Sequence, residues 1–65
     1  MVNARGFEAG DIVTVYGTYL CKVMSTTFGG MRVLVVGERD HGRSFNTTNE
    51  HVVIADISYT QAKDL

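Results

Sequence analysis

Apolar and β-branched residues occur in short runs along this chain, and glycines and polar residues separate them. Within the runs, apolar positions tend to alternate with polar ones, which is the period of a half-buried β-strand. Valine, isoleucine, threonine, tyrosine and phenylalanine, which favour strands, are frequent in them. The pattern therefore predicts an all-β protein. The five predicted strands span residues 11–16, 19–26, 31–36, 43–47 and 51–57.

The alternation also predicts which side chains face the interior. Lys22 and Arg32 mark the outward sides of two strands, so the residues next to them in the sequence face inward. The expected core consists of Val13, Val15, Cys21, Val23, Met31, Val33, Val35, Phe45, Val53, Ala55 and Ile57. This core occupies roughly residues 9–57 and leaves residues 58–65 as a polar tail, in which residues 60–63 suit a helical turn.

Turn signals predict how the strands connect. The Phe-Gly-Gly sequence at residues 28–30 can supply the positive φ angles of a tight hairpin, and the Asp-His-Gly sequence at residues 40–42 does the same. The segment 48–50 predicts a short 3₁₀ or helical turn that leads into the last strand. Five short strands connected in this way are typical of a small barrel or sandwich.

The sequence Gly10-Asp11-x-Val13-x-Val15 and the short turn at residues 46–50 resemble the SH3-like small barrels, including the KOW and Tudor-like ones. The resemblance covers about residues 9–57 and implies a five-stranded SH3-like barrel with a 3₁₀ turn before the last strand. The chain departs from well-known members, because it has no tryptophan or proline and carries Lys22 in a stretch where the KOW motif expects a glycine. Since one fold hosts many functions, the resemblance implies architecture only.

Composition and charge narrow the classes of function. A chain of 65 residues predicts one domain with a small core, and its single cysteine, Cys21, excludes an intrachain disulfide. Small domains are often stabilised by disulfides, a structural metal or association with another chain, and this sequence favours association, with a second copy or with a partner. The net charge of −1 argues against avid non-specific binding of nucleic acid, which needs a basic excess.

The sequence carries no sign of membrane insertion or export. No apolar run approaches the ~20 residues that cross a bilayer, and no signal-peptide pattern follows Met1. A lone thiol is also usual in a reducing compartment. These features predict a cytoplasmic protein without a membrane partner.

Residues with catalytic or metal-binding chemistry are few and lack diagnostic spacing. Cys21 could act as a nucleophile with His41 or His51 as its base, but a cysteine within a β-branched strand is typical of an inert core residue. Glu38 and Asp40 join the two histidines as metal-ligand types, without the spacing of zinc motifs. The sequence therefore predicts no enzyme, no metal and no cofactor.

Several apolar side chains fall on the outward side of the predicted strands. Such a surface usually marks a protein interface or self-association. The predicted interface consists of Tyr16, Tyr19, Met24, Leu34 and Val36, and Ile12 and Leu20 belong to the same outward set. Two alternatives remain open: the tail covers these residues, or the inward and outward sides are reversed and they form the core.

The densest polar segment, residues 38–43, predicts a rim beside this face. Arg39, His41 and Arg43 lie in it, and Arg32 lies on the preceding strand. Their donors could bind a carboxylate or a phosphate. Otherwise the segment is a solvated loop whose charges compensate one another.

Together these features predict a small, non-enzymatic protein-binding module. By analogy, we expect a phage or bacterial accessory protein that inhibits or recruits a larger protein, and a second copy of the chain is another candidate partner. The alternative is a nucleic-acid-binding SH3-like domain in which basic residues contact phosphates and a tyrosine stacks on a base. The residues for that role are Lys22, Arg32, Arg39 and Arg43, with Tyr16, Tyr19 and Tyr59 for stacking.

Overall fold

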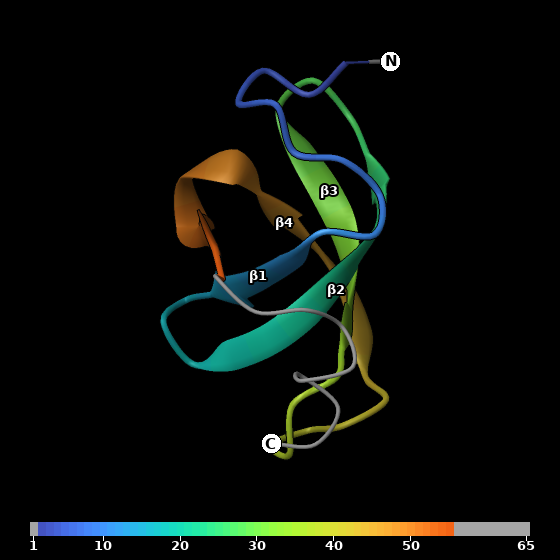
Figure 1. Ribbon diagram of the computed structural model, residues 1–65, viewed down its shortest axis with the longest axis vertical. Helices are drawn as coiled ribbons and strands as arrows, with labels where there is room; N and C mark the ends of the chain where they lie inside the picture. Colours follow the sequence, from blue (N-terminus) through green and yellow to red (C-terminus); the bar gives the residue numbers. More distant parts are fainter. Residues whose placement is uncertain (1, 56–65) are drawn as a thin grey trace.

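The computed structural model describes residues 2–55, which form five antiparallel strands and one 3₁₀ turn (Figure 1). The elements are β1 (Ile12–Val15), β2 (Tyr19–Thr26), β3 (Gly30–Val35), β4 (Ser44–Thr48), η1 (Asn49–His51) and β5 (Val52–Ile54). The predicted all-β fold, with five strands and a 3₁₀ turn before the last, is confirmed. The predicted tail at 58–65, its helical turn and Tyr59 lie outside the described residues.

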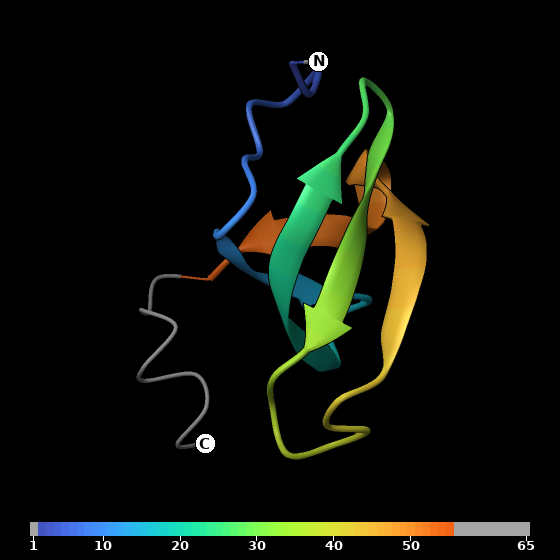
Figure 2. The same ribbon diagram turned by 90° about the vertical axis from the view of Figure 1, so that its right-hand side faces the viewer.

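The strands form a single sheet in the order β4-β3-β2-β1-β5. The longest strand, β2, pairs with β1 on one side and with β3 on the other. Its register against β3 shifts at Met24, where the extra residue of a β-bulge bends the strand. Figure 2 shows that β1 and β5 run across β2, β3 and β4, so that the sheet curls around its core. The SH3-like assignment stays a prediction.

Valine side chains fill the inner side of the curled sheet. The core cluster consists of Phe7, Val13, Val15, Cys21, Val23, Met31, Val33, Val35 and Val52, and Tyr19 and Phe45 pack against it. The predicted inner sides of the first three strands are therefore confirmed. Phe7 comes from the segment before β1. The core therefore includes a residue that precedes residue 9, the predicted start of the core.

The predicted inner side of the last strand is wrong by one residue. Val52 is buried, whereas Val53 is 68% exposed. The strand begins directly after η1, and Val52 pairs with Val15, which places Val52 on the core side. Because side chains alternate along a strand, Val53 then faces outward. Ala55 packs in a second cluster, and Ile57 lies outside the described residues.

This second cluster lies apart from the main core. Ile12 and Val36 are buried, Val36 to 3% exposure, and Leu20 and Ala55 pack against them. The strand β3 ends before Val36, and the backbone N–H groups of Val36 and its successor both donate to the Leu20 carbonyl, at 2.9 and 3.0 Å. The prediction that Ile12 and Val36 lie on an exposed face is therefore wrong.

An asparagine pair ties the segment before β1 to the rest of the fold. Asn3 is only 2% exposed, and its Nδ2 donates to the carbonyl oxygens of Thr27 at 2.8 Å and Gly30 at 3.0 Å. The same Nδ2 donates to Asn49 Oδ1 at 2.8 Å, and Asn49 Nδ2 donates to the carbonyl oxygen of Phe28 at 3.1 Å. These bonds join the N-terminal segment, the β2–β3 hairpin and η1 into one unit.

We expect Asn49→Ala to lower the free energy of unfolding by about 1–2 kcal/mol, because it removes one acceptor from the buried Asn3 amide and leaves polar groups less well paired. Chemical denaturation measures this change. Thr48→Ala is the matched control, since Thr48 is exposed and bonds only weakly to Glu50, at 3.4 Å. An equal loss of stability in both variants would contradict the role of the asparagine pair.

Candidate functional site

A hollow of about 240 Å³ opens between the β1–β2 turn and the start of β4. Its lining residues are Tyr16, Tyr19, Arg43 and Phe45, and we term it the aromatic groove. Tyr16 belongs to the turn, Tyr19 begins β2, Phe45 lies in β4 and Arg43 directly precedes β4. The turn and β4 are far apart in the sequence, so the curl of the sheet is what brings these side chains together.

The rings of the aromatic groove contact one another. Tyr19 meets Phe45 edge to face, with ring centroids 5.9 Å apart. Tyr16 lies nearly parallel to Phe45, at an interplanar angle of 19° and a centroid distance of 6.5 Å. Tyr16 also contacts His51 of η1, with centroids 4.7 Å apart. All three distances fall within the roughly 4.5–7 Å of interacting rings, so the four rings form a continuous aromatic cluster.

Tyr16 is held in an uncommon backbone conformation. Its φ angle is 56° and that of Gly17 is 64°, and the turn is closed by the Thr18 N–H, which donates to the Val15 carbonyl at 3.1 Å. Positive φ at both central positions is typical of a type I′ hairpin turn, in which asparagine or glycine usually fills the first position. A bulky residue there costs about 1–2 kcal/mol. The turn therefore holds an aromatic ring that is 54% exposed in a backbone conformation that tyrosine rarely adopts.

Arg43 gives the aromatic groove a positive charge. Its backbone is fixed, because its N–H donates to the Asp40 carbonyl at 3.0 Å and its carbonyl accepts from the Val35 N–H at 2.8 Å. The residue is exposed, and no carboxylate of residues 2–55 forms an ion pair with its guanidinium. His51 Nε2 lies 3.5 Å from Glu50 Oε1, a contact that is an ion pair only when the imidazole is protonated.

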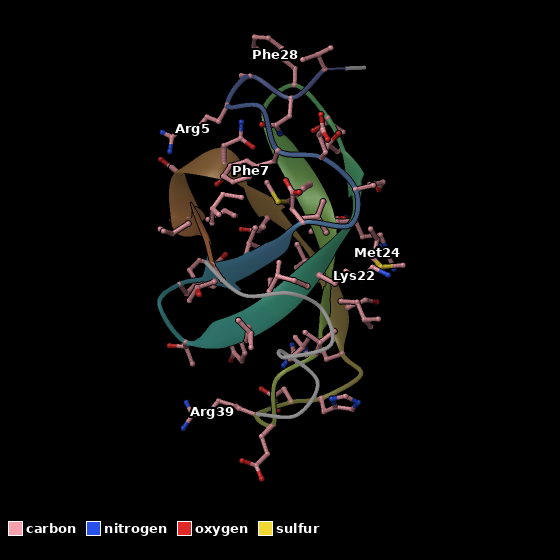
Figure 3. All side chains as sticks on the ribbon, viewed as in Figure 1. Arg5, Phe7, Lys22, Met24, Phe28 and Arg39 are labelled. Atoms are coloured by element: carbon pink, nitrogen blue, oxygen red, sulfur yellow. The ribbon has the colours of Figure 1, made fainter. Side chains whose placement is uncertain are left out.

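Of the four predicted rim residues, Arg43 lines the aromatic groove and the other three do not. Arg32 is exposed on β3 and donates to a serine hydroxyl of β4 at 3.3 Å. His41 Nδ1 lies 3.2 Å from a backbone carbonyl oxygen at the start of the β3–β4 loop. Arg39 belongs to that loop, at the end of the molecule opposite Phe28 (Figure 3). The predicted rim is therefore not a single cluster.

The five predicted interface residues also separate. Tyr16 and Tyr19 line the aromatic groove. Met24 is 46% exposed at the bulge of β2, and Leu34 is half-buried on β3. Val36 is buried and cannot contribute a free surface. Ile12, Lys22 and Leu34 do lie side by side across β1, β2 and β3, as the strand alternation predicted, but Ile12 and Val36 are buried, so this side of the sheet is not a free apolar surface.

Two ring residues of the site escaped prediction. The sequence assigned Phe45 to the core, and His51 only to a catalytic base or a metal ligand. Phe45 is half-buried, so one part of its ring packs on the core while another meets the aromatic groove. The feature of the sequence that indicated the site was the pair of tyrosines on either side of Gly17-Thr18. The contact of Tyr16 with His51 could not be predicted, because it depends on how η1 leads the chain back to β1.

Cys21 lies in the core and is fully buried. Burial raises the pKa of its thiol to about 11, so the neutral form dominates at physiological pH. The thiol donates to the Tyr19 carbonyl, at 3.6 Å. The four candidate metal ligands were Glu38, Asp40, His41 and His51. Residues 2–55 contain no group of three or more histidine, cysteine and acidic side chains that could hold a metal ion.

We expect iodoacetamide at pH 8 to alkylate Cys21 at least a hundred times more slowly in the native protein than in urea. With a pKa of about 11, the thiolate is only about 0.1% of the native thiol at that pH, and the core blocks access to it. Mass spectrometry over time measures both rates. Similar rates in the two conditions would show that Cys21 is accessible and reactive.

Comparisons with protein-family models, with curated proteins and with solved structures give no match. No helix in the described part of the chain is long and apolar enough to span a membrane. The aromatic groove, where exposed ring surface and an arginine meet, is the feature from which a function can be proposed.

Proposed function

We propose that this protein is a non-enzymatic protein-binding module that receives a segment of its partner in the aromatic groove. The observation that carries the proposal is a cluster of rings that borders an open hollow, one of them exposed on a strained turn, beside an arginine. Tyrosine and arginine are enriched among the residues that dominate binding energy at protein interfaces. A cytoplasmic location and a role as a phage or bacterial accessory protein, which inhibits or recruits a larger protein, belong to the same proposal.

The size of the aromatic groove favours a side chain over a small molecule. Its volume of about 240 Å³ lies below the roughly 300–1,000 Å³ of ligand pockets. A hollow of this size suits one aromatic or aliphatic side chain of a partner protein. Single anchors of this kind, inserted into a pocket, often contribute most of the affinity of an interface.

A nucleic-acid-binding domain is the alternative, because the same rings could stack on bases. The placement of the cations favours a protein partner. Figure 3 shows Arg5, Lys22 and Arg39 on different sides and ends of the molecule. A phosphate backbone is bound by several cations along one path, whereas in the part of the chain that the structure describes Arg43 is the one cation that lines the aromatic groove.

The test is affinity capture from a lysate of the source organism, with the wild-type chain and a Tyr16→Asn variant as baits. Each lysate is divided into nuclease-treated and untreated halves, and mass spectrometry identifies the retained proteins. The proposal expects a protein that the wild type retains in both halves and the variant loses. Material retained only without nuclease supports the nucleic-acid alternative. A protein retained equally by both baits would place the binding surface away from the groove and overturn the proposal.

A further inference from the structure

We infer that the aromatic groove selects an extended protein segment in which an apolar side chain and a carboxylate lie two residues apart. This inference rests on the proposed function, because it names the chemistry of the segment that the module would bind. It combines three properties of the groove, namely its single charge, the spacing of that charge from the rings, and the arrangement of the rings.

The charge of the groove calls for one anion. Among residues 2–55, Arg43 is the only charged residue that lines it, and no carboxylate of the same residues forms an ion pair with Arg43. A guanidinium binds a carboxylate through two parallel hydrogen bonds, which gives both strength and orientation. Arg43 would repel a lysine or arginine of the ligand at this position, so it also disfavours binding of basic segments.

The spacing of the groove matches an extended chain. Arg43 and Phe45 are two positions apart, and both side chains line the groove. The backbone here is extended, since Arg43 bonds to Val35 and Phe45 pairs with Val33 in one continuous ladder. Two residues of a strand span about 6.7 Å, and an extended ligand presents every second side chain to the same side at the same interval. The strand β4 lies at the edge of the sheet, where such a segment can run alongside it.

The rings supply the apolar half of the recognition. Tyr16 and Phe45 lie nearly parallel, and Tyr19 meets Phe45 edge to face, so three rings border one small hollow. A leucine or phenylalanine side chain of the ligand would contact all three rings there. An acidic residue two positions away from this apolar residue in the ligand would then place its carboxylate beside Arg43. An apolar residue, any residue and an acidic residue, in either order, is therefore the pattern that the groove recognises.

The experiment is a titration of the ¹⁵N-labelled protein, followed by NMR, because this method detects weak binding by short peptides. The probes are blocked heptapeptides with the sequence Gly-Ser-Phe-Ser-Asp-Ser-Gly and its reverse order, and matched peptides in which asparagine or lysine replaces the aspartate. Shifts are expected around Tyr16, Tyr19 and Phe45. We expect the aspartate peptide to bind at least tenfold more tightly than the asparagine peptide, as a charge-assisted bond allows.

Two variants test the role of the arginine. Arg43→Glu should reverse the preference, so that the lysine peptide binds more tightly than the aspartate peptide. Arg39→Glu is the matched control, because Arg39 is exposed and lies outside the groove, and it should leave the preference unchanged.

The outcomes separate this inference from the proposed function. If all peptides shift the groove residues equally, or if Arg43→Glu keeps the preference for aspartate, the carboxylate inference is wrong while peptide binding stands. A six-nucleotide oligothymidylate is titrated in the same way, and if it shifts the groove residues while no peptide does, both ideas are wrong. If no probe shifts them, the inference is overturned, and the lysate capture decides on the proposed function by itself.

Discussion

Val36→Glu is expected to unfold the protein at room temperature, whereas Leu34→Glu is expected to leave it folded. Val36 is buried against Ile12 and Leu20, so the new carboxyl group would lose its hydration without gaining a partner. An unpaired buried charge costs about 3 kcal/mol or more, and a domain of this length has a total stability of roughly 3–10 kcal/mol. Leu34 is half-buried, so a glutamate there can extend its carboxylate into water. Circular dichroism and thermal melting measure both effects.

Val36→Ala is the matched control for the charge. It removes buried methyl groups without adding a charge, and we expect a loss of only about 1–2 kcal/mol with the fold retained. A folded Val36→Glu variant with the melting temperature of the wild type would show that this position is accessible. Val36 would then return as a candidate interface residue, as the strand alternation predicted.

The alternation of side chains was sufficient to predict the inner sides of β1, β2 and β3. Valines recur at every second position in β1 and β3, as Val13 and Val15 show in β1, and Lys22 marks the outer side of β2. The last strand differs, because Val52 and Val53 are both apolar and either one could face inward. The choice depends on where η1 ends and β5 begins, and a 3₁₀ turn can shift that point by one residue. The local sequence does not determine it.

The N-terminal segment shows a second limit of sequence patterns. Phe7 is an isolated apolar residue among polar and small neighbours, so no periodicity marks it as part of the core. Asn3 gives no signal either, because its burial follows from carbonyl groups of the β2–β3 hairpin and from Asn49. Such contacts depend on tertiary structure alone.

The candidate site divides in the same way. Tyr16, Tyr19 and Arg43 were predicted as binding residues because tyrosine and arginine have recognisable chemistry. That they meet Phe45 in one groove could not be predicted, since the meeting depends on how the sheet curls to bring the β1–β2 turn close to β4. Residue types thus indicated binding, while the curl of the sheet determined which of them act together.

Tyr16→Asn is expected to separate stability from binding. Asparagine accepts the positive φ angle of this turn position more readily than tyrosine, so relief of strain should offset the lost ring contacts. We expect the free energy of unfolding to stay the same or to rise by up to about 1 kcal/mol. Binding of the protein captured by the wild type should weaken about thirtyfold or more, the loss of ~2 kcal/mol that defines a binding hot spot. Thermal melting and isothermal calorimetry measure the two quantities.

Two controls make the separation informative. Phe28→Ser removes a ring that is even more exposed than that of Tyr16 and does not line the groove, and it should leave affinity unchanged. Tyr16→Val also removes the tyrosine ring but places a β-branched residue at positive φ, so it should lose both affinity and stability. If Tyr16→Asn instead lost stability as Tyr16→Val does, the ring would be needed to hold the turn, and the strain at Tyr16 would no longer indicate a binding role. Retained affinity in a stable Tyr16→Asn variant would remove Tyr16 from the site. If the unfavourable backbone conformation of Tyr16 serves to present its ring to a partner, removal of the ring must weaken binding.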